Sequence, residues 1–249
     1  MPTVDLCGFQ MYFEDRGDGE PLLLLHGGMG IGSDWRHVFP SDPTGYRVIV
    51  PDLRGHGRST NPDRTFTFRQ CADDLLALLD HLGLARVQAI GMSMGAKTLL
   101  HMATRQPARI DAMVLVSATP RFPPQLRMAA AQFTREAFDR LPGPERDALR
   151  QRHVHGDDQI RLLYDLTRSF ATSDDDMAFT ALQLGTVTAR TLIVHGDRDP
   201  YYPIEMAIEL FRGIPQSALW IVPYGAHGPI FGPRAPAFAA AALAHLAGA

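Results

Sequence analysis

Cysteine is nearly absent from this chain of 249 residues, which contains only Cys7 and Cys71. Two cysteines are too few for a disulfide framework, so we expect both to be reduced thiols. No hydrophobic run approaches the roughly 20 residues that a membrane-spanning helix needs. The first residues also lack the basic and apolar regions of a signal peptide. These absences together favour a cytoplasmic protein that does not enter a membrane.

Positive charge is also scarce, since 24 lysines and arginines stand against 27 aspartates and glutamates, a formal net charge of −3. Such a chain offers no positive field to a phosphate backbone, which argues against a nucleic-acid partner. Its apolar share of 45% and charged share of 20% are typical of globular proteins with one sizeable core. We therefore expect a small-molecule ligand, and the sequence leaves the oligomeric state open.

Short, fully apolar runs recur along the chain and predict the strands of a sheet. They lie at residues 22–25, 48–50, 87–90, 113–116, 192–194 and 219–222, after an expected hairpin of residues 4–6 and 10–14. Strands that are apolar on both faces are typical of a mostly parallel sheet covered by helices on both sides. Between two of the runs, leucines at residues 75–82 follow the period of an amphipathic helix, which Gly83 ends. The pattern predicts an α/β fold.

The alternation of strands and helices stops between Ser117 and Arg190, where helical patterns follow one another without strands. Residues 126–141 place apolar side chains on one face of a predicted helix, Pro142 and Pro144 interrupt it, and a second helix is expected around residues 160–164. We expect this insertion to lie over the carboxyl ends of the strands as a cap. The prediction is one domain, 1–249, with a core of 1–119 and 187–249 and a helical cap or lid at 120–186.

The most specific motif is Gly-Met-Ser-Met-Gly at residues 91–95, which directly follows the apolar run 87–90. A helix is expected over residues 96–105, so the motif lies on a sharp strand-to-helix turn that raises the Ser93 hydroxyl above the sheet. Glycines suit such a turn because it is strained and backbones approach closely there. The context predicts a nucleophilic serine.

A serine hydroxyl needs a base to take its proton and a further group to orient that base. Asp197 and Asp199 follow the run 192–194, and His227 follows the run 219–222 in a loop flanked by glycines. Polar residues just past parallel strands converge at one edge of a sheet. The chain order serine, aspartate, histidine is the order expected for one of the folds that carry such a triad. His245 competes for the role of the base, but its alanine-rich helix favours a place facing solvent.

These motifs, in this order, resemble the α/β-hydrolase superfamily over nearly the whole chain. The matching segments are His26-Gly27-Gly28, residues 52–59, the serine turn, residues 195–203 and residues 225–228. The resemblance decides between the aspartates, because the acid of the family lies four residues before a proline, as Asp199 lies before Pro203. It implies Ser93, Asp199 and His227 as the catalytic triad, while Asp197 closes the turn.

The oxyanion of the reaction requires two backbone N–H donors. The resemblance implies Met94, directly after the nucleophile, and a residue of the loop after the run 22–25. Gly28 is the preferred candidate there and Met29 the next, because a glycine lets its amide approach a substrate oxygen closely. Met94 and Trp35 are candidates for lining the acyl pocket. Ala96 stands where many relatives have a further glycine, which affects helix packing rather than chemistry.

Other polar motifs favour structural roles. His26 is expected to tie its loop by a hydrogen bond. Residues 52–59 lack the Gly-Lys-Ser or Gly-Lys-Thr of a phosphate loop and are expected to form a structural turn. His153 and His155 have the spacing of metal ligands on a strand but no acidic or cysteine partner, so surface positions are favoured. We predict no metal and no cofactor.

The resemblance implies a serine esterase that cleaves a carboxylic ester, or a related acyl compound, through an acyl-enzyme. The same triad would serve a hydrolase of carbon–carbon bonds in vinylogous diketone acids, as in the meta-cleavage-product hydrolases, or a lactonase. Such acidic substrates call for an arginine in the pocket, and Arg121, Arg127, Arg161 and Arg168 are candidates in the cap. Perhydrolysis, by likeness to the cofactor-free haloperoxidases around residues 92–95, and a non-catalytic receptor on the same fold also remain open. A serine in place of aspartate at the turn argues against dehalogenases and epoxide hydrolases.

Overall fold

The computed structural model describes residues 3–6, 8–173 and 176–248, and an eight-stranded sheet runs through it in the order β1-β2-β4-β3-β5-β6-β7-β8. The strands are β1 (Thr3–Leu6), β2 (Phe9–Arg16), β3 (Glu20–Leu25), β4 (Tyr46–Pro51), β5 (Val87–Met92), β6 (Ile110–Val116), β7 (Arg190–Gly196) and β8 (Ser217–Val222). The pairs β1–β2 and β2–β4 are antiparallel and all the others are parallel. Each predicted apolar run lies within one strand, and the predicted opening hairpin is confirmed.

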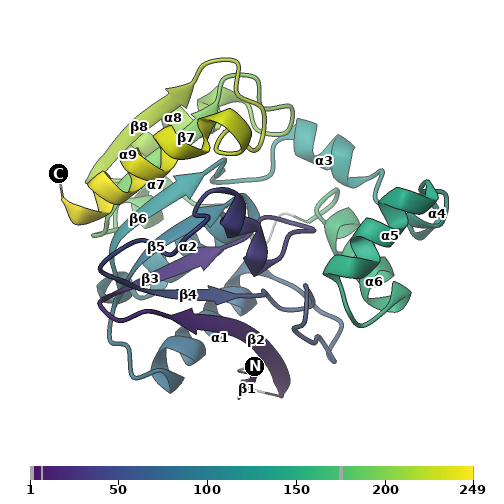
Figure 1. The fold of residues 1–249 in the computed structure, drawn as a ribbon. Helices are drawn as coiled ribbons and strands as arrows, with labels where there is room; N and C mark the ends of the chain where they lie inside the picture. The colour runs from purple at the N-terminus through teal and green to yellow at the C-terminus, as the bar shows by residue number, and fades with distance from the viewer. Residues whose placement is uncertain (1–2, 7, 174–175, 249) are drawn as a thin grey trace.

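Helices cover both faces of the sheet, which explains why its strands are apolar on both sides. The helices of the core are α1 (Phe68–His81), α2 (Met94–Arg105), α8 (Ile204–Gly213) and α9 (Ala235–Ala247), with 3-10 helices η1 (Gly32–His37), η2 (Pro107–Arg109) and η3 (Gly232–Arg234). Side chains of α1, α2 and α8 join one buried cluster, and those of η1 and α9 join another on the opposite face. The predicted α/β-hydrolase fold is thus confirmed (Figure 1).

A helical insertion follows β6. It contains α3 (Pro124–Ala130), α4 (Arg135–Asp139), α5 (Gly143–Arg152), α6 (Asp157–Ser169) and α7 (Ala181–Leu184). Helices α4, α5 and α6 lie together on the right of Figure 1, whereas α7 packs against α8. The prediction of one helix through residues 126–141 is wrong. The chain leaves α3 after Ala130, and Thr134 starts α4 anew by accepting a hydrogen bond from the Ala137 N–H. Apolar spacing alone did not reveal this N-cap.

Two further details of the chain bear on the sequence-based expectations. Cys71 is a free, buried thiol in α1, and burial raises its pKa; Cys7 lies outside the described residues. Within the described ranges, no helix has both the length and the apolar character needed to cross a membrane.

Candidate active site

The turn that carries Ser93 is strained in the way that the sequence predicts. Ser93 joins β5 to α2 with a φ of 48°, in the left-handed region that side chains other than glycine rarely adopt. A Cβ on Gly91 would lie 2.6 Å from the carbonyl carbon of Gly95, and a Cβ on Gly95 would collide with the backbone of Leu25. Both glycines are therefore required by close packing, and Ser93 is 8% exposed at the top of the sheet.

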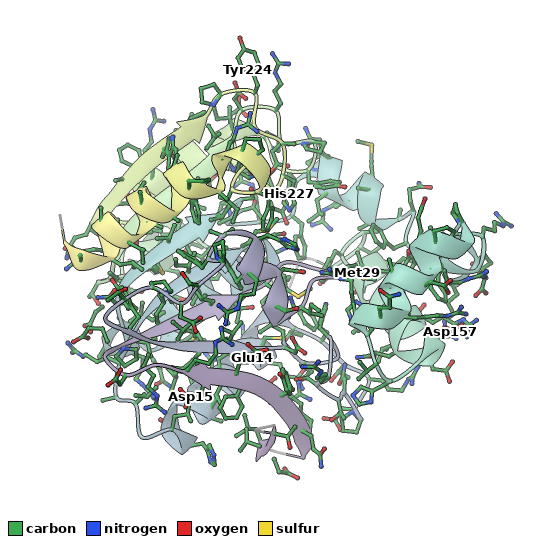
Figure 2. All side chains as sticks on the ribbon, in the orientation of Figure 1. Glu14, Asp15, Met29, Asp157, Tyr224 and His227 are labelled. Atoms are coloured by element: carbon green, nitrogen blue, oxygen red, sulfur yellow. The ribbon has the colours of Figure 1, made fainter. Side chains whose placement is uncertain are left out.

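His227 links Ser93 to Asp199. Its Nε2 lies 2.9 Å from Ser93 Oγ, and its Nδ1 lies 2.8 Å from Asp199 Oδ2. With Nδ1 donating to the carboxylate, Nε2 is free to accept the serine proton. The loops after β5, β7 and β8 thus bring together the three side chains that the sequence singled out. His227 is labelled in Figure 2.

The carboxylate of Asp199 is fully buried, yet it remains ionised. Burial alone would raise its pKa, but the hydrogen bond from His227 and those from the N–H groups of Tyr201 and Tyr202 hold the pKa below its ordinary value. Asp197 instead accepts a hydrogen bond from the Gly225 N–H at 3.2 Å and so fastens the two loops to each other. The two aspartates have the separate places expected for them.

A residue that directly follows β6 also contacts the site, and the sequence patterns did not single it out. Ser117 follows β6, and its Oγ donates to the carbonyl oxygen of His227 at 2.6 Å. Its own N–H donates to Val194 O, so the hydroxyl is fixed to the sheet. A polar residue directly after the predicted strand 113–116 was the available signal. The residues of the site thus follow four adjacent strands of the sheet, β5, β6, β7 and β8.

The loop after β3 carries Gly28, one of the two predicted donors to the oxyanion; Met94 is the other. Among the hydrogen bonds of the described residues, none engages the N–H of Gly28 or of Met94. The first residue of a helix has no intrahelical acceptor for its N–H, so the Met94 amide is available to a ligand. Gly28 lines a cavity of about 160 Å³. Met29 turns its side chain into the apolar cluster of the insertion, between the two parts of the molecule (Figure 2).

The lining of this cavity includes several of the predicted residues, but not the side chains of Ser93, Asp199 and His227. The cavity is lined by His26, Gly27, Gly28, Met29, Gly30, Asp34, Trp35, Met92, Arg152 and Phe231. Trp35 is present as expected, whereas Met94 is buried in the core beneath and Met92 lines the cavity in its place.

The arginine of the cavity is one that the sequence analysis did not consider. Arg152, at the end of α5, forms an ion pair with Asp34 there. The predicted candidates lie elsewhere: Arg121 pairs with Glu209, Arg127 donates to backbone carbonyls and Arg161 pairs with Asp139. Arg168 is also absent from the lining. No sequence pattern marked Arg152, because its position depends on how the insertion folds back.

Three of the histidines weighed in the sequence, His26, His153 and His245, have structural contacts. His26 Nε2 accepts from the Leu53 N–H at 2.9 Å, which ties its loop as predicted. His153 is fully buried and accepts from the Gly57 N–H at 3.0 Å, so the expected surface position of His153 is wrong. His245 is half-buried rather than fully in solvent, with its Nε2 3.3 Å from Arg190 O. No cluster of possible metal ligands occurs within the described part of the chain.

The segment 52–59 is a structural turn, as predicted. The Asp52 carboxylate accepts from the N–H groups of Gly32 and Arg58, at 2.7 and 2.9 Å. Ser59 Oγ donates to the Asp52 carbonyl oxygen at 2.6 Å. These bonds use the groups that a phosphate would otherwise need.

An α/β sheet with a serine on a strained turn, and a histidine and a carboxylate in line with it, defines a serine hydrolase of the α/β fold. The sequence profile described as alpha/beta hydrolase fold matches residues 20–155, more than half of the chain. The chain belongs to this family, as the sequence motifs predicted.

Similar proteins agree with this assignment. The 2-hydroxy-6-oxononadienedioate/2-hydroxy-6-oxononatrienedioate hydrolase 2 of Pseudomonas putida is 29% identical over 248 residues, which cover 85% of this chain and 83% of that protein. A solved thermophilic esterase from Thermogutta terrifontis has a TM-score of 0.70 at 27% identity, covering 92% of this chain and 90% of its own. The meta-cleavage product hydrolase of Pseudomonas fluorescens shares the fold, with a TM-score of 0.75 at 22% identity over 100% of this chain and 98% of its own.

Proposed function

We propose that Ser93 is the nucleophile of this hydrolase, His227 its general base and Asp199 the acid that orients the base. The observation that carries the proposal is the hydrogen-bonded row from Asp199 Oδ2 through His227 to Ser93 Oγ, at 2.8 and 2.9 Å. Ser93 attacks the substrate carbonyl while His227 takes its proton, and Asp199 holds the resulting imidazolium. The amides of Gly28 and Met94 receive the oxyanion.

We further propose that the bond cleaved is a carbon–carbon bond in an oxo acid, and this replaces the ester as the first candidate. The Pseudomonas putida relative acts on such acids by its name, and its alignment covers most of both chains. Arg152 supports the assignment, because a cation that reaches the cavity beside Gly28 suits a substrate carboxylate. Its guanidinium has five N–H donors, so it can bind Asp34 and a ligand together.

In this reaction the serine chemistry is unchanged and only the leaving group differs. The bond between the acyl carbon and its neighbour breaks, and the electron pair passes into the conjugated oxo acid, which takes up a proton. Water that His227 activates then hydrolyses the acyl-enzyme. The small cavity of about 160 Å³, with apolar walls from Trp35, Met92 and Phe231, suits a short acyl group.

An ester remains the second candidate, supported by the solved esterase at 27% identity. An alkoxide is an easier leaving group than a carbanion, so a site that cleaves carbon–carbon bonds also has the groups to cleave activated esters. The candidates therefore differ in relative rates and not in the triad.

Initial rates separate the candidates. We would compare 2-hydroxy-6-oxononadienedioate with p-nitrophenyl esters from acetate to decanoate, using the native protein, Ser93→Ala, and Ser169→Ala as an exposed control on α6. A kcat/KM for the oxo acid at least tenfold above that of every ester supports the carbon–carbon hydrolase, and the reverse order supports the esterase. Activity that persists in Ser93→Ala would overturn the nucleophile, and binding without any turnover would favour a receptor.

A further inference from the structure

Ser117, the residue directly after β6, has a backbone conformation that its own side chain disfavours. Its φ is 49°, in the left-handed region that residues other than glycine rarely adopt, and the residue is fully buried. A glycine would adopt this conformation without the steric conflict of a Cβ. Strained residues persist only where the surrounding contacts hold them, and they are common at functional sites. The contacts of the serine hydroxyl therefore show what the side chain adds at this position.

The hydroxyl of Ser117 holds the main chain of the proposed general base. Its Oγ donates to the carbonyl oxygen of His227 at 2.6 Å. The direction of this bond is fixed, because a carbonyl oxygen can only accept. Among the hydrogen bonds of the described residues, it is the one that engages the main chain of His227. Asp197 fastens the same loop two residues earlier, at the Gly225 N–H. The place of the His227 backbone thus depends on Ser117.

The same end of β6 also holds the proposed nucleophile. The carbonyl oxygen of Val116 accepts from the Ser93 N–H at 2.8 Å, and the Ser117 N–H donates to Val194 O at 2.9 Å. These bonds continue the sheet from β5 across β6 to β7, the order in which the three strands lie (Figure 1). Ser93 and His227 are therefore each one hydrogen bond away from consecutive residues of one rigid strand end. Their separation is set there.

The ring of His227 requires such a fixed backbone, because it makes two hydrogen bonds at once. Its Nδ1 lies 2.8 Å from Asp199 Oδ2, and its Nε2 lies 2.9 Å from Ser93 Oγ. A shift of the backbone would lengthen one of these bonds or the other. Catalysis is sensitive to such shifts, since a misplacement of about 1 Å can lower a rate roughly a hundredfold.

We propose that Ser117 is a positioning residue of this hydrolase, whose hydroxyl holds the His227 main chain so that the imidazole stays in line between Asp199 and Ser93. The inference rests on the proposed roles of these three residues. Ser117 acts only through His227, and it neither gives nor takes a proton in the reaction. The strain at Ser117 accompanies this contact, because a glycine would relieve the strain but lose the hydroxyl.

Ser117→Ala and Ser117→Gly form a matched pair, because both lose the hydroxyl and only the alanine keeps the strained Cβ. We would measure kcat and KM on p-nitrophenyl acetate, with the thermal midpoint Tm of each variant. Both variants should lower kcat roughly ten- to a hundredfold and leave KM within about twofold. The Tm of Ser117→Gly should exceed that of Ser117→Ala by about 2–4 °C. The rate would then follow the hydroxyl, and the stability would follow the backbone.

A double variant tests whether Ser117 acts through His227. His227→Ala removes the base and leaves a residual rate, because substrate binding and the oxyanion donors alone give roughly 10³–10⁴ over water in serine proteases. Adding Ser117→Ala to His227→Ala should leave this residual rate within about twofold, since residues that act as a unit are not additive. A residue that merely supports the shape of the site would lower the residual rate as well.

Ser59→Ala is the control, because Ser59 is also fully buried and its hydroxyl also donates to a carbonyl oxygen, that of Asp52, at 2.6 Å. Its loss should lower Tm and leave kcat within about twofold. Native kcat in Ser117→Ala, with Ser93→Ala inactive, would overturn the inference and leave the proposed function intact. A kcat that recovers together with Tm in Ser117→Gly, or a further fall in the double variant, would reduce Ser117 to a structural role. An active Ser93→Ala would overturn the proposed function itself.

Discussion

At the scale of single residues, Asp197 and Asp199 are separated by one position and have different partners. Asp199 Oδ2 faces His227 Nδ1 at 2.8 Å, while Asp197 accepts from the Gly225 N–H. Only the carboxylate of Asp199 can select the histidine tautomer that leaves Nε2 free for a proton. Substituting each aspartate in turn therefore tests which carboxylate orients His227.

Asp199→Asn should lower kcat by about four orders of magnitude with KM little changed, the effect of a wrong tautomer in a serine triad. Asp197→Asn should lower kcat less than tenfold, because it loosens one loop contact. Steady-state kinetics on one ester at pH 7.5, with circular dichroism to verify folding, measures both. Equal losses in the two variants would contradict the assignment of Asp199.

Lys97 makes the free energy of unfolding depend on pH. Burial lowers the pKa of Lys97 from its ordinary value of 10.5, which holds in the unfolded chain, to about 7 in the folded protein. Between these two pH values the unfolded chain binds a proton that the folded protein does not. Stability therefore rises with pH across this window, and the penalty is complete below about pH 7. Lys97→Met should reduce the slope between pH 8 and 9.5 by about 1.4 kcal/mol per pH unit, the value of one proton. Urea unfolding at a series of pH values measures the slope, and an unchanged slope would show that the lysine stays charged.

At the scale of elements, the sequence predicted strands well and the insertion poorly. Each strand of the parallel core carries an apolar run that burial on both faces demands, and the glycines at 91 and 95 mark the turn before α2. Each of these apolar runs in the strands β5, β7 and β8 is followed by one of the proposed catalytic residues. It could therefore be predicted that Ser93, Asp199 and His227 lie close together. The place of Arg152 could not be predicted, because it depends on how α5 packs against the rest of the chain.

The end of α5 determines how Arg152 reaches the cavity. Its guanidinium pairs with Asp34 of η1, and the next residue, His153, is buried against the turn at Gly57. Arg152→Met should raise KM for carboxylate-bearing substrates roughly ten- to a hundredfold, since a charge-assisted bond is lost, and leave KM for neutral esters within about twofold. Arg161→Met, which loses a pair with Asp139 on the exposed side, should change neither. Equal effects on both substrate classes would remove Arg152 from substrate recognition.

At the scale of the whole molecule, three buried histidines join its parts. The ring of His56 lies 5.1 Å from that of His26 and 5.9 Å from that of His153, centroid to centroid. His26 belongs to the loop beside Ser93, His56 to the turn after β4, and His153 to the insertion. Desolvation lowers their pKa values to about 4, 3 and 3, so all are neutral where the fold is stable.

Because these histidines are neutral in the folded protein, the cluster makes the free energy of unfolding depend on acid. Between pH 6.5 and about 4 the unfolded chain protonates these histidines and the native one does not, so stability is present above pH 6.5 and is lost as pH falls. Removing one of them should remove one proton from the slope, about 1.4 kcal/mol per pH unit. His153→Asn keeps an acceptor for the Gly57 N–H and should reduce the slope of the unfolding free energy between pH 6 and 5 by that amount. His81→Gln, at an exposed position of α1, should leave the slope unchanged. If both variants keep the native slope, His153 is protonated in the folded protein, and the contact between α5 and the turn at Gly57 does not sense acid.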